Sequence, residues 1–92
     1  KKLKIEIEVR DFNELEQVLK IGRIDRIMLD NFTPDETRQA VVLINGKYET
    51  ESSGGITLET IRDYALAGVD YISVGALTHQ IFSLDLSLNA II

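Results

Sequence analysis

Apolar and charged residues alternate along residues 3–9, near the start of the chain. Ile5, Ile7 and Val9 share one face of this stretch, and charged side chains share the other. A period of two residues is typical of a β-strand that buries one face. Three later runs also have the length of strands, namely residues 26–30, 48–52 and 70–74. The pattern therefore predicts four strands, of which the third is the least apolar.

The stretches between these strands have the start and stop signals of helices. Asp11 and Glu14 form a capping box in front of residues with helical spacing. Thr33 and Glu36 form a second box, and Pro34 strengthens it because proline suits the first helical position. Each of the three expected helices ends at a glycine: Gly22, Gly46 and Gly68.

The third helix is expected over residues 58–67, just after the segment Ser53-Gly54-Gly55. Thr57 is predicted to cap it, so that its free N–H groups and its dipole face the glycine turn. Strand end, glycine turn and helix start would then form a site suited to a phosphate group. A tight turn that needs glycine for steric reasons explains the same residues equally well.

Two short runs follow the fourth predicted strand. Residues 77–82 are expected to form a short helix. Residues 84–88 alternate between apolar and polar side chains, and so short a run is compatible with either a strand or an extended tail.

The ends of the predicted strands recur at a regular interval. A polar residue or a glycine marks each end, at Glu8, Asp30, Ser53 and Gly75, so the intervals are 22, 23 and 22 residues. Four βα units of one size imply parallel strands joined by right-handed crossovers. Units this short and regular favour a (β/α) barrel, which needs eight units and ~250 residues. The predicted fold class is therefore α/β, with four consecutive parallel βα units that form half of a TIM-like barrel.

Composition and charge narrow the possible functions. The chain has 92 residues, of which 45% are hydrophobic and 27% charged, as in an ordinary small soluble domain. It has no cysteine, which excludes disulfides and thiolate metal sites and is compatible with the cytoplasm, the location we expect. No apolar run approaches the ~18 residues of a membrane span. A net charge of −5 argues against a nucleic-acid partner.

In a (β/α) barrel the active site lies at the carboxyl ends of the strands. Glu8 and Asp30 would lie there on neighbouring strands, where their oxygens suit ribose hydroxyls or a Mg²⁺ ion that carries phosphates. Solvation, or pairing with Lys4 or Arg26, is the alternative for each carboxylate taken singly.

Barrels often bind phosphate with their last two βα loops, and two glycine loops are present here: Ser53-Gly54-Gly55 and Gly75-Ala76. His79 is the only histidine and follows the second loop. A general-acid role or a phosphate contact is conceivable for it, but a hydrogen-bonded structural role is the better interpretation.

Four segments carry a more specific signal. They read Met-Leu-Asp-Asn-Phe-Thr-Pro at residues 28–34, Glu-Ser-Ser-Gly-Gly-Ile-Thr at 51–57, Gly-Val-Asp-Tyr-Ile-Ser-Val-Gly-Ala-Leu-Thr-His at 68–79, and Leu-Asp-Leu-Ser-Leu at 84–88. In order and spacing they closely resemble the C-terminal barrel portion of the quinolinate phosphoribosyltransferase family. The resemblance covers nearly the whole chain, from about residue 5 to residue 88.

This resemblance implies an enzyme of NAD synthesis. Such an enzyme converts quinolinate and phosphoribosyl pyrophosphate, with Mg²⁺, to nicotinate mononucleotide, pyrophosphate and CO₂. By motif, Glu8 and Asp30 would be the catalytic carboxylates that hold the ribose and its metal. The phosphates would be bound by residues of the two glycine loops: Ser53, Gly54, Gly55, Gly75, Ala76 and Leu77.

Members of this family grip quinolinate with basic residues that the resemblance places upstream of Lys1, in an N-terminal α/β domain and the early barrel strands. We therefore interpret residues 1–92 as one partial barrel domain, the C-terminal half, which carries the phosphoribosyl half of the site and is inactive alone. A stand-alone phosphate-binding half-barrel or assembly module is the alternative. In both cases the uncovered sheet edges predict a homo-oligomer.

Overall fold

The computed structural model describes residues 4–74 and 80–83. Within these residues, one sheet has the order β1-β2-β3-β4-β5, with strands β1 (Glu6–Val9), β2 (Arg26–Asp30), β3 (Glu49–Ser53), β4 (Tyr71–Val74) and β5 (Gln80–Ser83). The first four strands are parallel, and β5 pairs antiparallel with β4. The helices that connect the parallel strands are α1 (Phe12–Ile21), α2 (Pro34–Ile44) and α3 (Ile61–Leu66).

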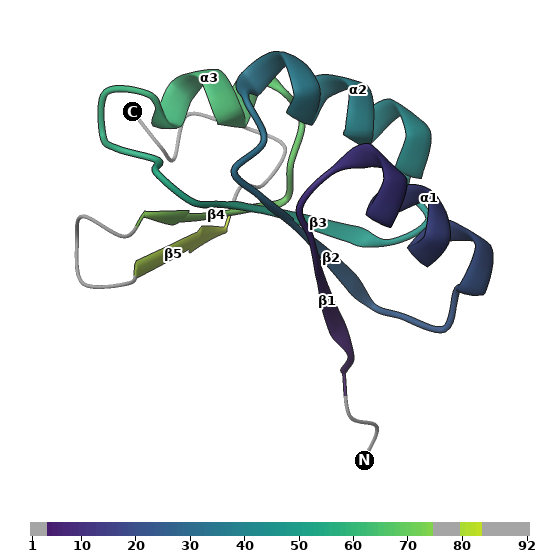
Figure 1. The fold of residues 1–92 in the computed structure, drawn as a ribbon. Helices are drawn as coiled ribbons and strands as arrows, with labels where there is room; N and C mark the ends of the chain where they lie inside the picture. Colours follow the sequence, from purple (N-terminus) through teal and green to yellow (C-terminus); the bar gives the residue numbers. More distant parts are fainter. Residues whose placement is uncertain (1–3, 75–79, 84–92) are drawn as a thin grey trace.

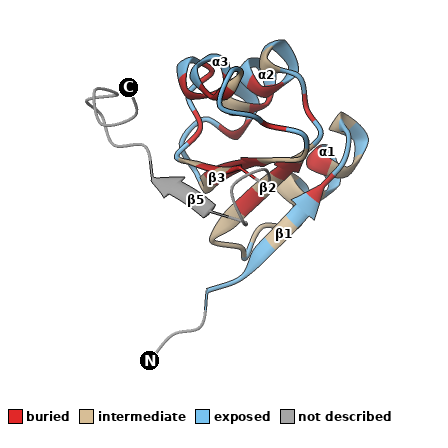
Figure 2. Cartoon of the chain, turned by 90° about the vertical axis from the view of Figure 1, so that its left-hand side faces the viewer, coloured by how far each residue is buried: buried red, intermediate tan, exposed pale blue. Residues whose placement is uncertain are grey.

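All of these helices lie on one face of the sheet (Figure 1). Ile27 and Leu29 of β2 and Ile72 and Val74 of β4 are fully buried on that face. The buried residues gather between the sheet and the helices (Figure 2). Four parallel strands that alternate with helices confirm the predicted α/β class. The strand bounds also agree to within about a residue, except that β1 begins at Glu6 rather than at residue 3.

The first two helices begin where the capping residues predict. Thr33 Oγ1 accepts a hydrogen bond from the Glu36 N–H (3.1 Å), and Glu36 Oε1 accepts one from the Thr33 N–H (2.9 Å), which completes the box. Asp11 Oδ1 likewise accepts from the Glu14 N–H (2.8 Å). The Glu14 carboxylate, however, accepts from the N–H of Arg10 (2.7 Å), so the first capping box is only half formed.

The third helix begins later than predicted. α3 starts at Ile61 rather than at residue 58, and Thr60 rather than Thr57 occupies the N-cap position. The Thr60 N–H and the Ile61 N–H both bond to the carbonyl of Thr57 (3.1 and 2.9 Å), which makes a separate turn between the glycines and the helix. The Thr60 side chain makes no capping hydrogen bond to α3 and instead accepts from the Thr57 N–H (3.0 Å), so the helix start does not face the glycine turn directly.

The short helix expected over residues 77–82 is also wrong for its described part. Residues 80–83 form β5, whose backbone pairs with β4 from Tyr71↔Ser83 to Val74↔Gln80. This pairing occupies the outer edge of β4, and the hydrogen bonds of a sheet ladder replace those of a helix. Residues 84–88 lie outside the described part of the chain.

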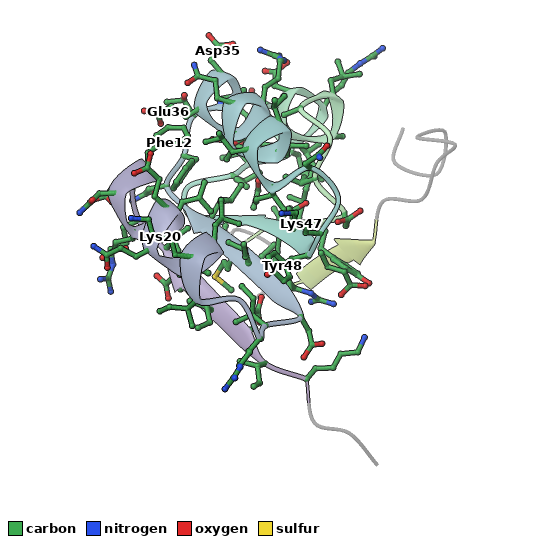
Figure 3. All side chains as sticks on the ribbon, turned by 90° about the vertical axis from the view of Figure 1, so that its right-hand side faces the viewer. Phe12, Lys20, Asp35, Glu36, Lys47 and Tyr48 are labelled. Atoms are coloured by element: carbon green, nitrogen blue, oxygen red, sulfur yellow. The ribbon has the colours of Figure 1, made fainter. Side chains whose placement is uncertain are left out.

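Different residues lie at the two ends of the sheet. Phe12 and Glu36 mark the first turns of α1 and α2, which lie at the carboxyl ends of the strands, whereas Lys47 and Tyr48 lie at the opposite end (Figure 3).

None of the helices in residues 4–74 and 80–83 has the length and apolar character of a membrane span.

The capping geometry gives a direct test of the helix starts. We expect Thr33→Ala to lower the free energy of unfolding by about 1 kcal/mol, because it removes the N-cap of a complete capping box. Urea denaturation of the two proteins measures this difference. Thr57→Ala is the matched control, for which we expect a loss below ~0.5 kcal/mol, because Thr57 caps no helix. Equal losses at the two threonines would contradict this assignment of the caps.

Candidate functional site

The face of the sheet opposite the helices is polar, and we call it the open face. Side chains alternate along a strand, so residues between those buried beneath the helices belong to this face. The charged residues of the open face in β1, β2 and β3 are Glu6, Glu8, Arg26, Asp30, Glu49 and Glu51. The open face of these strands therefore combines several carboxylates with a single guanidinium.

Glu8 and Asp30 lie on adjacent strands near their carboxyl ends, as predicted. Glu8 pairs with Met28 in the register of β1 and β2, so Asp30 lies one strand away and two residues further along. Glu8 is exposed and Asp30 is partly exposed. Within the described ranges, no ion pair joins either carboxylate to Lys4 or Arg26, so the pairing alternative is not observed. Both carboxylates are accessible to a ligand.

The end of β2 and the glycine turn after β3 lie in direct contact. Asp30 pairs with Ser53, and the Asn31 N–H donates to the Ser53 carbonyl (2.9 Å). Gly54 has a φ of +92°, and a Cβ atom there would lie 2.8 Å from Asp30 Oδ1 and 2.7 Å from Asn31 Oδ1. Gly54 is therefore required for steric reasons, and its backbone lies beside the Asp30 carboxylate. Gly55, with a φ of +69°, is exposed at the next position.

The turn that follows β2 is anchored in the core. The Tyr64 hydroxyl of α3 donates to the Phe32 carbonyl (2.8 Å), and the Phe32 ring packs against Phe12 of α1 with 5.3 Å between ring centroids. Burial, followed by the charges of Glu36 and Asp63, raises the pKa of the Tyr64 hydroxyl, which therefore stays a donor. Contacts from two helices thus fix the backbone that presents the candidate site.

A charged cluster on the open face was not identified from the sequence. Arg26 Nη1 lies 3.3 Å from Glu51 Oε1, and Arg26 Nη2 lies 3.3 Å from Glu49 Oε1. The same guanidinium lies over the Tyr71 ring, with 3.8 Å from Cζ to the ring centroid. The sequence signal was the matching alternation of Arg26 with Glu49 and Glu51, but only the strand register shows that these positions meet.

Glu51 has the most perturbed environment of these groups. Its side chain is only 2% exposed. Burial, followed by the nearby carboxyl group of Glu6, raises the pKa of Glu51 to about 7, although Arg26 acts in the opposite direction. Glu51 is therefore a carboxyl group that changes its protonation near neutral pH.

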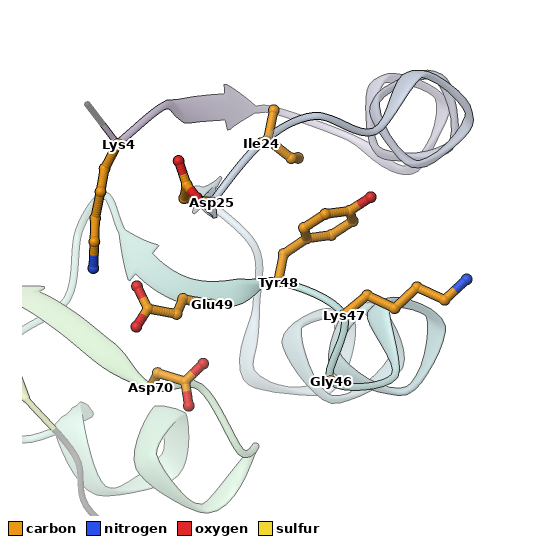
Figure 4. Close-up of a pocket in the computed structure, with 8 residues that line it drawn as sticks. All are labelled: Lys4, Ile24, Asp25, Gly46, Lys47, Tyr48, Glu49 and Asp70. Atoms are coloured by element: carbon orange, nitrogen blue, oxygen red, sulfur yellow. The ribbon is translucent and has the colours of Figure 1, made fainter. Parts of the chain in front are cut away.

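The second predicted phosphate loop, with Gly75, Ala76 and Leu77, lies outside the described residues, as does His79. A cavity of about 460 Å³ lies at the amino ends of the strands, opposite the end that carries Glu8 and Asp30 (Figure 4). Its three carboxylates support the fold: Asp25 accepts from the Ile5 N–H (2.7 Å), Asp70 accepts from the Thr50 N–H (2.9 Å), and Glu49 pairs with Arg26 (3.3 Å). This cavity is therefore not the predicted site.

Comparisons with known proteins agree with the motifs. A family model described as quinolinate phosphoribosyl transferase, C-terminal domain, matches residues 1–89. The chain is 43% identical over 99 residues to the chloroplastic nicotinate-nucleotide pyrophosphorylase [carboxylating] of Arabidopsis thaliana, covering 92% of this chain and 28% of the relative. It is 45% identical over 95 residues to a probable nicotinate-nucleotide pyrophosphorylase [carboxylating] of Methanocaldococcus jannaschii, covering 96% and 33%.

A solved structure has the same fold. The nicotinate-nucleotide pyrophosphorylase of Ehrlichia chaffeensis superposes with a TM-score of 0.77 at 38% identity, covering 92% of this chain and 31% of that one. The chain thus spans about a third of the length of the proteins it matches.

The contact at Gly54 predicts a large effect of a small substitution. We expect Gly54→Ala to lower the free energy of unfolding by roughly 2 kcal/mol or more, because the added methyl group meets Asp30 and Asn31 at a positive φ. Gly46→Ala is the matched control, since Gly46 has a φ of +75° but no atom within 4 Å of the added Cβ. Equal losses in urea denaturation would show that backbone strain alone requires Gly54.

The raised pKa of Glu51 predicts a pH-dependent stability. Between about pH 4.5 and pH 7, the unfolded chain loses this proton before the folded one, which lowers the free energy of unfolding by up to roughly 3 kcal/mol. Glu51→Gln cannot ionise, so its stability relative to the parent should rise with pH across this window. Urea denaturation at several pH values measures the difference, with Glu16→Gln on the exposed side of α1 as control. A difference between Glu51→Gln and the parent that stays constant with pH would contradict the raised pKa.

Proposed function

The chain belongs to the quinolinate phosphoribosyltransferase family, whose C-terminal domain it matches, and we propose that it forms the phosphoribosyl-binding part of such an enzyme. The proposed reaction joins quinolinate to phosphoribosyl pyrophosphate and yields nicotinate mononucleotide, pyrophosphate and CO₂. The observation that carries this proposal is the contact between the Asp30 carboxylate and the Gly54 backbone at the carboxyl ends of adjacent parallel strands.

This contact combines the two kinds of group that a phosphoribosyl donor needs. Carboxylates accept hydrogen bonds from ribose hydroxyls, and Glu8 and Asp30 are accessible on neighbouring strands. Glycine backbone without a Cβ atom allows a phosphate to approach the N–H groups of a turn, and Ser53, Gly54 and Gly55 would supply them. The corresponding role proposed for Gly75, Ala76 and Leu77 rests on the motif alone.

A carboxylate beside a phosphate group repels it unless a cation or a hydroxyl group lies between them. Within residues 4–74 and 80–83, no cluster of three or more His, Asp or Glu side chains could hold a metal. Mg²⁺ commonly uses one or two carboxylates together with substrate phosphates. Glu8 and Asp30 fit this mode, and Mg²⁺ held by them would supply charge neutralisation for the pyrophosphate.

The carboxylates would also contribute to the chemical step. As the ribose loses its pyrophosphate, positive charge develops on the ring, and fixed negative groups stabilise such charge. Asp30 is suited to this role because its position is held by the contact with Gly54 and by the anchored turn after β2. Solvent reorganisation around a fixed carboxylate costs little during the reaction.

Quinolinate needs a different environment from the donor. Its two carboxylates call for cations, whereas Arg26, the basic residue of the described strands, is already bonded to Glu49 and Glu51. We therefore assign residues 1–92 to the donor side of the reaction and assign the quinolinate side to basic groups other than Arg26.

Binding of Mg²⁺-phosphoribosyl pyrophosphate tests this proposal. We expect isothermal titration calorimetry to show binding by the chain, and Asp30→Asn or Glu8→Gln to weaken it by about tenfold or more, as expected when a hydrogen bond to a charged group is lost. Glu16→Gln, on the exposed side of α1, should bind like the parent. Absence of binding by the parent, or unchanged affinity in Asp30→Asn, would contradict the donor site.

The same preparation should not turn over quinolinate, because Arg26, the one basic residue of the described strands, is already bonded to Glu49 and Glu51. Turnover by the 92 residues alone would contradict the assignment to the donor side. Donor binding without a role for Glu8 or Asp30 would instead favour a phosphate-binding half-barrel that takes no part in catalysis.

A further inference from the structure

One side chain on the open face contacts the two strands beyond its own. Arg26 belongs to β2, reaches Glu49 and Glu51 of β3 at 3.3 Å, and lies over the ring of Tyr71 in β4. It is the only basic residue in the described strands β1 to β5. Its side chain is 22% exposed, so its ion pairs are screened less by water than surface pairs. Three neighbouring strands are thus connected through a single guanidinium.

The positions of these contacts along the strands are regular. Arg26 precedes Asp30 by four residues, and Glu49 precedes Ser53 by four. Tyr71 likewise precedes residue 75, the first position of the second predicted phosphate loop, by four. Four residues of a strand span about 13 Å, so Arg26 does not reach a ligand bound at the strand ends. We therefore expect Arg26 to act on the site through the positions of β2, β3 and β4 rather than by contact.

The charges around Arg26 show why its contacts with β3 and β4 matter. Without Arg26, the carboxylates of Glu49 and Glu51, two residues apart on one face of β3, would repel each other, and the nearby carboxyl group of Glu6 in β1 would add to the repulsion at Glu51. The guanidinium offsets this repulsion, and its planar group can bond two carboxylates while it stacks on an aromatic ring. A lysine at this position keeps the charge but not this geometry.

We infer that Arg26 is a positioning residue, which holds the ends of β2, β3 and β4 in the arrangement that the donor site requires. The expected effect of Arg26 on donor binding rests on the proposed function. The expected effect of Arg26 on the positions of the strand ends does not. The Asn31 N–H, which donates to the Ser53 carbonyl at the strand ends, reports directly on that arrangement.

Amide hydrogen exchange measured by NMR tests the structural part. In Arg26→Met we expect the protection of the Asn31 N–H to fall about tenfold relative to that of the Ile44 N–H in α2, because local opening is separate from global unfolding. Arg26→Lys should show a smaller loss of the same kind, and it carries the test if the methionine variant fails to fold. A residue that only adds overall stability would lower both protections equally.

Arg38→Met is the matched control. It removes an arginine that pairs with Asp35 (2.7 Å) on the exposed side of α2, away from the open face. We expect the ratio of the two protections to stay unchanged there. An unchanged ratio in both Arg26 variants would overturn the inference.

Donor affinity supplies the second readout. In the folded Arg26→Lys protein we expect the Kd for Mg²⁺-phosphoribosyl pyrophosphate to rise about fivefold, with no change in Arg38→Met. If the parent binds no donor, the proposed function fails. The ratio of the Asn31 and Ile44 N–H protections still decides whether Arg26 holds the strand ends. If Arg26→Lys lowers the protection of the Asn31 N–H relative to the Ile44 N–H but binds the donor as the parent does, the inference that Arg26 positions the donor site is overturned.

Discussion

The rest of the structure depends on the burial of one face of a parallel sheet beneath its connecting helices. Ile27, Leu29, Ile72 and Val74 have no exposed surface, and each fully buried side chain of this size contributes about 1.5–3 kcal/mol. Because side chains alternate along a strand, this burial also determines which residues occupy the open face. Glu8 and Asp30 reach the candidate site because their neighbours Val9 and Leu29 are in the core.

The third strand departs from this division, and it is the strand that leads into the glycine turn. Its residues on the helix side are polar: Thr50 bonds to Asp70, whereas the buried hydroxyl of Ser52 has no hydrogen-bond partner among residues 4–74 and 80–83. On the open side Glu51 is buried beside Arg26. Natural sequences often break packing rules near functional positions, and a strand with these costs is consistent with a site at its end.

Local signals in the sequence predict much of this fold. Thr33, Pro34 and Glu36 lie within one turn of chain and determine the start of α2 by themselves, and the alternation in β1 and β2 assigns their faces. The failures concern choices that local signals leave open. Thr57 and Thr60 are both residues of a type that caps helices, and the observed turn leaves Thr60 at the N-cap position without a side-chain cap. Residues 80–83 become a strand only because the edge of β4 is available to pair with them.

The candidate site also has one part that the sequence predicts and one part that it does not. Strand ends at a regular interval placed Glu8, Asp30 and Ser53 correctly at one end of the sheet, since parallel strands present their carboxyl ends together. The Arg26 cluster depends on the pairing of residue 26 with residue 49, and this register joins segments 23 residues apart. No pattern within either strand specifies that pairing.

Gly54 shows how a steric requirement and a binding role can share one residue. A turn without a Cβ atom is needed here because the Asp30 carboxylate and Asn31 occupy the space where that atom would lie. The same absence leaves the backbone N–H groups of the turn open to a ligand. The two interpretations of the glycine turn are therefore compatible. A carboxylate packed against a turn of this kind places a partner for hydroxyl groups next to a partner for phosphates, and a phosphoribosyl donor carries both.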